Sequence, residues 1–357
     1  KDHATLPGTP EHHPGFPLSE AREIVKDLFA PSPLVYWLDF LFHTTLGWGM
    51  FVLTLLAPPW SLWQLLFYVV SALSLYRAVI FTHELAHLRK NTFRLFRIAW
   101  NICCGFPLML PSFMYNGVHN DHHKRKVYGT REDGEYLPFA VGQPFKIVLY
   151  VLLAFILPLM IAMRFILLTP LSWLHAGLRR LLWESASSLT IDFDYRRPPA
   201  SSRRDETSWR LQEFCTFLYG AVAVGLATAG IIPWQALLLW YLVAVLMLLL
   251  NSLRTLAAHC YRNPGDRVMD YAEQYLDSVN IPGNALITPL WAPVGLRYHA
   301  THHLFPSLPY HALGKAHRRL AANLSDSALY LQTTRSSLWD ALRRLWHESR
   351  AHHPAAR

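Results

Sequence analysis

Long apolar runs separated by short polar segments dominate the pattern of this 357-residue chain. A bilayer crossing takes about 20 apolar residues in a helix. Four runs reach that length, at residues 34–57, 60–81, 211–230 and 233–257. The connector inside each successive pair carries no charge, so the runs pair into two hairpins. The pattern predicts an all-α, multi-pass integral membrane protein with four spans.

A fifth apolar run, at residues 145–168, does not fit this scheme simply. Pro158 interrupts it and Arg164 follows, and an internal proline removes a helix hydrogen bond and favours a kink. A single crossing here would also place the last histidine cluster, described below, on the opposite side of the membrane from the earlier ones. We therefore expect a re-entrant or in-plane hairpin sheltered by protein. An ordinary fifth crossing is the alternative.

The remaining segments predict the parts outside the bilayer. Residues 171–194 are amphipathic, which suits a helix lying in the membrane interface, and the Pro/Ser/Arg-rich residues 196–208 indicate an exposed loop. We expect one domain over residues 1–357, with a membrane core at 31–320 and cytoplasmic tails at 1–30 and 321–357. A helical cytoplasmic cap would carry the histidine clusters.

Composition and charge agree with a membrane protein: 52% of residues are hydrophobic, 16% are charged, and the net charge is +9. The basic residues gather at the run ends opposite the uncharged connectors, so the positive-inside rule places both termini and the histidines in the cytoplasm. The membrane is expected to be a bacterial inner membrane. The basic residues follow topology, which argues against nucleic acid and favours anionic lipid or an acidic partner. The four cysteines lack metal spacing, so we expect free thiols.

Histidines form three tight clusters, H-E-L-A-H, H-N-D-H-H and H-A-T-H-H. Residues three and four apart share one face of a helix, and imidazole is the commonest biological metal ligand. The spacing therefore predicts a polynuclear, nitrogen-rich metal centre. The clustered residues are His83, His87, His119, His122, His123, His299, His302 and His303.

Other histidines do not share this spacing. His43 and His175 stand alone in the sequence and are expected to be structural. Histidines near the ends of the chain are expected in solvated tails. These terminal residues are His3, His12, His13, His347, His352 and His353.

The first cluster also matches the zinc-protease pattern, in which two histidines bind zinc and a glutamate activates water. That alternative makes Glu84 the general base and needs one further ligand, for which Asp277 is the available carboxylate. It gives the six other clustered histidines no role. A membrane metal-binding or sensing protein without catalysis is a second alternative, against which the complete ligand set argues.

The three boxes, their order and the late run H-H-L-F-P-S-L-P-Y-H resemble the membrane fatty-acid desaturase superfamily over about residues 31–320. The resemblance implies two iron ions, O2 as co-substrate and attack on an unactivated C–H bond of an acyl chain. It also implies a ninth ligand, His259. Redox-inert zinc cannot supply such an oxidant, whereas iron can.

Residues beside the ligands are candidates for orienting the imidazoles. Glu84, Asn120 and Asp121 lie between ligands, and the alternative for the two carboxylates is that they are solvated charges on a helix face. Some relatives hold a metal-bound water with an asparagine. Asn251 and Asn280 are the nearby asparagines, and neither matches that spacing, so this ligand stays open.

The reaction itself is less constrained by the sequence. Desaturation of a fatty acyl group is the first expectation, and decarboxylation of a free fatty acid to a terminal alkene is the runner-up, favoured if Arg89 or Arg297 pairs with the carboxylate. Lipid hydroxylation comes third. No dinucleotide fingerprint or haem domain is visible, so an external ferredoxin, rubredoxin or cytochrome-type electron donor is implied.

Overall fold

The computed structural model describes residues 15–89 and 92–353. Within these ranges the chain is helical, and extended pairing is confined to isolated bridges such as the one between His259 and Ser278. The all-α prediction is therefore confirmed. The elements in chain order are α1 (Leu18–Val25), η1 (Lys26–Leu28), α2 (Pro33–Leu56), α3 (Leu62–His87), α4 (Arg94–Trp100), η2 (Asn101–Gly105), α5 (Phe113–His122), α6 (Phe145–Ala162), η3 (Met163–Leu168), α7 (Thr169–Ser172), α8 (Ala176–Ser185), α9 (Arg203–Thr228), α10 (Gln235–Leu256), α11 (Tyr271–Asp277), α12 (Thr288–Trp291), α13 (His299–Leu304), α14 (Tyr310–Asn323), α15 (Ser327–Leu331) and α16 (Leu338–His352).

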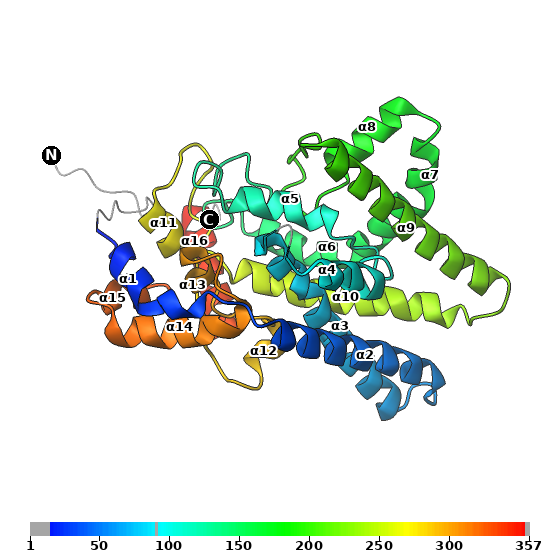
Figure 1. Cartoon of the computed structure of the whole chain (residues 1–357), viewed down its shortest axis with the longest axis horizontal. Helices are drawn as coiled ribbons and strands as arrows, with labels where there is room; N and C mark the ends of the chain where they lie inside the picture. Colours follow the sequence, from blue (N-terminus) through cyan, green and yellow to red (C-terminus); the bar gives the residue numbers. More distant parts are fainter. Residues whose placement is uncertain (1–14, 90–91, 354–357) are drawn as a thin grey trace. The chain divides into compact units, whose positions relative to one another are not determined.

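These elements belong to two compact units (Figure 1). The first unit combines Lys1–Pro31, His119–Val151 and Asn251–Arg357, and the second combines Ser32–Val118 and Leu152–Leu250. His3, His12 and His13 lie outside the described residues.

In the second unit α2 and α3 form an antiparallel hairpin (Figure 1). Ser61 caps α3 by accepting a hydrogen bond from the Gln64 backbone N–H. The two helices approach closely at Gly47, where an added Cβ would lie 2.6 Å from Leu75 Cγ. Ser71 Oγ donates to the Gly47 carbonyl at 2.8 Å. A small residue therefore permits the close packing that membrane helices use.

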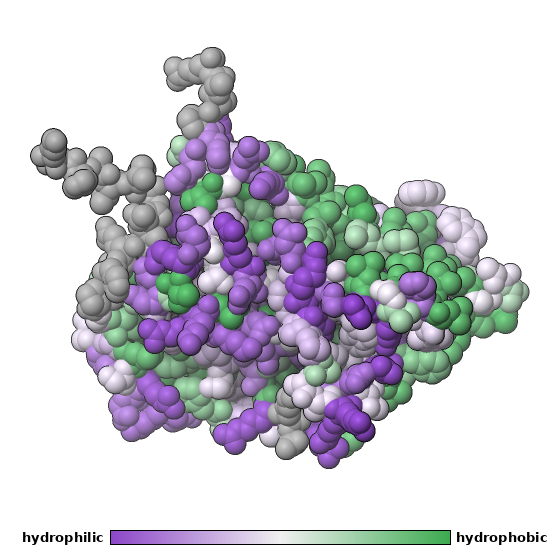
Figure 2. All heavy atoms as spheres, turned by 90° about the horizontal axis from the view of Figure 1, so that it is seen from above, coloured by the Kyte–Doolittle hydropathy of each residue, from purple (hydrophilic) through white to green (hydrophobic). Residues whose placement is uncertain are grey.

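The four predicted spans are confirmed as long apolar helices, namely α2, α3, α9 and α10. Figure 2 shows one face of the molecule, on which hydrophobic residues gather toward the right-hand side. Many large hydrophobic side chains of these helices are exposed, among them Leu38, Leu65, Leu218 and Leu238. A surface of this kind suits contact with lipid tails. The protein is thus an integral membrane protein of the multi-pass all-α class, and its orientation remains a prediction.

The hairpin expected within residues 145–168 is wrong. The backbone runs as one helical segment from Phe145 to Ser172, which is 28 residues long, and Pro158 lies inside α6 without reversing it. The π-helical turn η3 follows and continues into α7. Among the described residues, five helices, not four, are long and apolar enough to cross a membrane.

The segment after this run differs in part from its prediction. Helix α8 covers the middle of the expected interface helix, and an irregular stretch follows it. The predicted loop at 196–208 ends early because α9 begins at Arg203. Ser202 caps it by accepting from the Asp205 backbone N–H. This local capping signal explains the earlier helix start.

A buried ion network ties α8 and η3 to α9 in the second unit. The Arg164 guanidinium donates to Glu213 Oε1 at 2.7 Å and to Ser187 Oγ at 2.9 Å, and Arg179 donates to Glu213 Oε2 at 2.6 Å. The side chains of Arg164 and Glu213 are only 5% and 2% exposed. The Glu213 carboxylate thus forms ion pairs with both Arg164 and Arg179.

Glu213→Gln should destabilise the protein by about 3–5 kcal/mol because it leaves buried guanidinium charge uncompensated. Thermal melting in detergent micelles measures the loss. Glu206→Gln is the matched control, since its pair with Arg210 lies on the same helix with side chains 46% and 61% exposed and should contribute little. Equal melting temperatures for the two variants would contradict the assignment of a stabilising role to the network.

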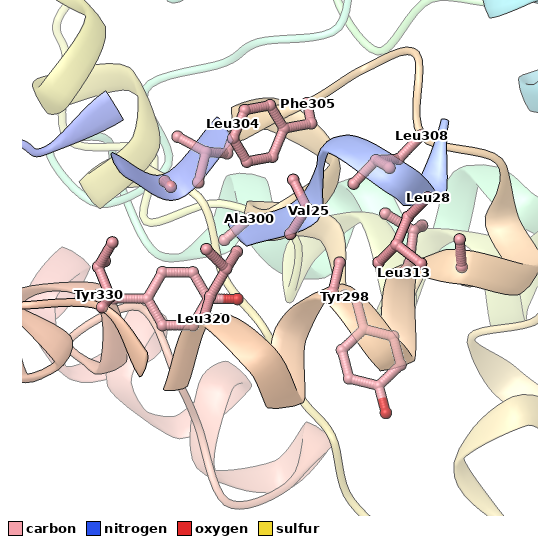
Figure 3. Close-up of a cluster of buried hydrophobic side chains, with 14 of the residues drawn as sticks. Val25, Leu28, Tyr298, Ala300, Leu304, Phe305, Leu308, Leu313, Leu320 and Tyr330 are labelled. Carbon is pink, nitrogen blue, oxygen red and sulfur yellow. The ribbon is translucent and has the colours of Figure 1, made fainter. Parts of the chain in front are cut away.

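The first unit has its own hydrophobic core, in which α1 lies along α14 and α13 packs beside both (Figure 1, Figure 3). Val25 and Leu28 of the N-terminal segment meet Leu304 and Leu313 there. The described parts of both predicted tails are therefore ordered helices. His353 is exposed at the end of α16, with Nε2 3.0 Å from the Val141 carbonyl oxygen. The core holds α13, and with it the third histidine box, in place.

Candidate metal centre

Three chain segments deliver imidazoles to one place in the first unit. The second box occupies the end of α5 and the residue after it, and the third box forms the short helix α13. His259 follows α10, a candidate span, by three residues. Because these residues are far apart in sequence, only the tertiary fold brings them together.

Four of these imidazoles form a closed group. The ligand atoms of His122, His259, His299 and His303 all lie within 4.8 Å of one another, and the residues are 2%, 5%, 5% and 8% exposed. The Nε2 atom of His259 is 3.3 Å from Nε2 of His122 and 3.0 Å from Nε2 of His299. Nε2 of His299 is 3.1 Å from Nε2 of His303. The four ring nitrogens therefore face a common point.

The remaining histidines of the second and third boxes form a second group. His119, His123 and His302 present ligand atoms within 4.8 Å of one another, and Nε2 of His123 is 3.2 Å from Nε2 of His302. The first box belongs to the second unit, where His83 and His87 occupy the last turn of α3 with ring centroids 5.1 Å apart. Each box thus directs its imidazoles from one helical face, as its spacing predicts.

These separations fit metal coordination. Two imidazoles bound to one ion at about 2.1 Å place their nitrogens about 3.0 Å apart at right angles and about 3.4 Å apart in a tetrahedron. The four-imidazole group shows separations of 3.0–3.3 Å between neighbouring Nε2 atoms. The donor set is almost wholly neutral nitrogen, which suits a transition metal and not Mg²⁺ or Ca²⁺.

Two carboxylates orient the second box. Asp133 accepts at 2.8 Å and 3.0 Å from Nδ1 of His122, and Glu135 lies 2.5 Å from Nδ1 of His119. Such contacts fix the tautomer and direct Nε2 toward a metal. Asp133 is fully buried and also accepts the backbone N–H groups of Gly129 and Glu135. Sequence reasoning missed both carboxylates, which lie in R-E-D-G-E after the second box.

Burial keeps part of this centre neutral. It lowers the pKa of His259 and of His303 well below the ordinary value, and neighbouring imidazoles lower both further. For His122, burial is again the largest influence and lowers the pKa, but the carboxylates of Asp133, Glu135 and Asp277 together outweigh it, and the net shift is upward. Neutral imidazole is the form that binds metal.

His259 has a different set of neighbours. Its Nδ1 is 2.8 Å from the Tyr128 hydroxyl and 3.3 Å from Ser278 Oγ. Tyr128 and Tyr136 both donate to Asp277 Oδ2 at 2.9 Å. Burial raises the pKa of Asp277 to about 6, although both phenols act to lower it. The phenols stay protonated because burial raises the pKa of each well above its usual value.

A buried polar group anchors the helix that carries the third box. Asn280 accepts from the Thr301 backbone N–H at 3.1 Å and donates to Thr301 Oγ1 at 3.0 Å. The Tyr330 hydroxyl is 2.7 Å from Thr301 Oγ1 and 2.9 Å from Nδ1 of His317. Asn280, considered above as a holder of metal-bound water, is thus engaged in positioning α13. Asn251, the other asparagine, accepts from Arg254 at 2.9 Å.

The other singled-out residues have assignable contacts. Glu84 accepts a hydrogen bond from Tyr36, and its Oε1 is 3.6 Å from Nδ1 of His83. Asp121 accepts from Lys124 at 2.5 Å. Arg297 donates to the Pro282 carbonyl at 3.1 Å.

The lone histidines and the cysteines also match their expectations. His43 contacts the Asp39 backbone carbonyl at 2.8 Å, and His175 caps α8 by accepting from the Leu178 N–H. Both are structural, as expected. All four cysteines are free, which confirms the thiol prediction.

Comparison with known proteins gives two findings. The chain matches the model of the family described as "Fatty acid desaturase" over residues 57–335. It is 40% identical over 339 residues to the ceramide hydroxylase of Caulobacter vibrioides (strain NA1000 / CB15N), which covers 95% of this chain and 95% of that protein. No solved structure matches the chain significantly. All nine candidate ligands lie inside the matched residues.

Proposed function

Because the chain belongs to the membrane fatty acid desaturase family, we propose that it is an O2-dependent di-iron enzyme that hydroxylates a membrane lipid of the ceramide class. The observation that carries the metal part of this proposal is the buried group of four imidazoles. The name of the 40% identical relative moves the proposed reaction from desaturation, the first expectation from the sequence, to hydroxylation.

The proposal assigns all nine histidines to two irons. One iron would be held by the buried group of His122, His259, His299 and His303. The other would be held by His119, His123 and His302. The three-box sequence pattern implies that His83 and His87 complete its ligand set. The two irons, when bound, supply an oxidant strong enough for an unactivated C–H bond. Zinc is redox-inert and cannot do so.

The chain's own residues would prepare the site for this chemistry. Asp133 and Glu135 hold two imidazoles in orientation, and burial excludes water from the metal-binding nitrogens. His259 and His87 lie at or just after the ends of candidate membrane helices α10 and α3. A lipid substrate can therefore reach the ligands while its chains remain among apolar helices.

The reaction balances with an external electron donor. Hydroxylation consumes the lipid C–H bond, one O2, two electrons and two protons, and yields the C–OH product and water. Desaturation consumes the same reagents but yields an alkene and two waters. The family model keeps fatty acyl desaturation as the second candidate. Decarboxylation ranks below both, because Arg297 donates to backbone carbonyls and lies over the Tyr298 ring. Arg89 is then the arginine available to pair with a free carboxylate.

Product analysis of the purified enzyme tests this function. A ceramide in mixed micelles, a reduced electron carrier and isotope-labelled O2 should give a ceramide that has gained one labelled oxygen atom. An olefin without added oxygen would replace hydroxylation with desaturation. Stoichiometric zinc, with peptide cleavage lost on Glu84→Gln, would replace the whole proposal with proteolysis.

An exposed basic run beside the ligands suits the electron donor. Lys124, Arg125 and Lys126 directly follow His122 and His123, and all three are exposed. Complementary charge accelerates encounter with an acidic protein. We therefore assign this run, on the proposed cytoplasmic side of an inner membrane, to docking of an acidic carrier such as ferredoxin.

Reversing these charges with the triple variant K124E/R125E/K126E should raise the KM for reduced ferredoxin on the order of tenfold at low salt. The difference should shrink at high ionic strength because salt screens the attraction. Turnover with a small chemical reductant should stay unchanged. The matched control R343E/R344E reverses two exposed charges on α16 of the same unit. An equal effect of both variants would contradict a specific docking site, and loss of vesicle binding in place of ferredoxin affinity would assign the run to anionic lipid.

A further inference from the structure

His259 differs from the second-box histidines in how its outer nitrogen is held. Its Nε2 atom faces His122 and His299 at 3.3 Å and 3.0 Å, so Nδ1 points away from the metal-binding point. Nδ1 contacts the Tyr128 hydroxyl at 2.8 Å and Ser278 Oγ at 3.3 Å. Neither neighbour is a carboxylate, in contrast to Asp133 and Glu135 at the second box.

The protons of these two hydroxyl groups are already committed. Ser278 Oγ donates to the Gln274 carbonyl at 2.9 Å. Tyr128 lies 2.9 Å from Asp277 Oδ2. A hydroxyl has one proton to give, and an ionised carboxylate only accepts.

Asp277 is surrounded by donors, which identifies it as an acceptor. Tyr136 donates to the same Oδ2 at 2.9 Å, and the Arg262 backbone N–H donates to Oδ1 at 3.4 Å. The Tyr128 proton therefore points to Asp277. Consequently, the hydroxyl oxygens of Tyr128 and Ser278 can only accept a hydrogen bond from His259. The donor must be His259 Nδ1, which therefore carries the proton.

We propose that Asp277 and Tyr128 are positioning residues that fix His259 in the Nδ1–H tautomer and so keep the lone pair of Nε2 available to a metal. This inference rests on the proposed function only in taking His259 as a metal ligand. Asp277 acts on His259 through Tyr128, without touching it. Asp277, which the zinc-protease alternative would use as a metal ligand, is thus separated from His259 by the Tyr128 hydroxyl.

Asp277→Asn tests the direction of these hydrogen bonds without changing size. Unlike the two phenol hydroxyls, the Arg262 backbone N–H, 3.4 Å from Oδ1, cannot turn. We therefore expect the amide oxygen of the new side chain at the Oδ1 position and its NH2 group at the Oδ2 position. Tyr128 must then accept from that NH2 and turn its own proton to His259 Nδ1. The imidazole proton moves to Nε2, where it blocks metal binding.

Titration of metal-free protein with Co²⁺, followed by its visible spectrum, measures the effect without any need for turnover. Asp277→Asn should weaken the four-imidazole site by about 10–100-fold. Tyr128→Phe should have a smaller effect, because Ser278 still accepts from Nδ1. Tyr136→Phe is the matched control: it removes a hydroxyl from the same carboxylate oxygen and should bind Co²⁺ as the parent protein does.

The double variant Asp277→Asn with Tyr128→Phe provides the decisive comparison. If the misdirected Tyr128 proton causes the loss, deleting that hydroxyl should restore the affinity to the level of Tyr128→Phe alone. A double variant as weak as Asp277→Asn, or an Asp277→Asn protein that binds Co²⁺ normally, would overturn the proposal. Failure of the ceramide assay alone would instead reject the proposed reaction and leave this metal measurement standing.

Discussion

Replacing His259 with alanine should give a folded membrane protein that has lost about half of its iron and all measurable lipid oxidation. The Nε2 atom of His259 lies within 3.3 Å of two other Nε2 atoms, from His122 and His299, so it contributes to the centre of the four-imidazole group. Three imidazoles would remain, and Tyr128 and Ser278 would lose the group that they contact. Iron per purified chain and product yield are the measurements.

His311→Ala is the matched control for this experiment. His311 follows the third box by eight residues but is exposed and belongs to neither ligand group. It should keep full iron content and turnover. Unchanged iron in His259→Ala would remove His259 from the ligand set, whereas a lower melting temperature with normal iron would reduce it to a packing residue.

The helices were predictable from the sequence because apolar run length directly reflects bilayer thickness. The prediction of a hairpin at residues 145–168 was wrong because it treated Pro158 as a residue that interrupts the helix. A proline removes one backbone hydrogen bond, but membrane helices tolerate that loss when neighbouring groups or a local π-helical turn compensate. Here the helix passes through Pro158 and adjusts at Met163–Leu168.

The candidate ligands could be recognised in the sequence for a related reason, since helical spacing places each box on one face. The groups that orient them could not, because those groups depend on tertiary folding. Asp133, Asp277 and Tyr128 lie on loops or at a helix end. Tyr128 contacts His259 across 131 positions of the sequence and Asp277 across 149. From the sequence alone, the available candidates for orienting the histidines were residues adjacent to them, such as Asp121. In the structure Asp121 is paired with Lys124.

Asp133→Asn should weaken iron binding and activity by about 10–100-fold, the usual cost of losing a partner behind a metal-binding histidine. Both oxygens of Asp133 accept: Oδ1 from the Glu135 N–H at 3.0 Å and Oδ2 from the Gly129 N–H at 2.8 Å, each shared with His122 Nδ1. An amide has one acceptor oxygen, so its NH2 group must face a backbone N–H. That conflict costs roughly 1–3 kcal/mol in addition.

Glu132→Gln separates the specific effect from the loss of a local negative charge. Glu132 is adjacent to Asp133 but exposed, so its amide variant should retain iron, activity and melting temperature. If Glu132→Gln and Asp133→Asn lost iron equally, the loss of a negative charge near the site would explain the result, and not the contacts of Asp133. If Asp133→Asn lowered the melting temperature while its iron affinity stayed intact, the carboxylate would serve the loop alone. Combined loss of affinity and stability is the expected result, because one buried side chain holds both His122 and the turn from Gly129 to Glu135.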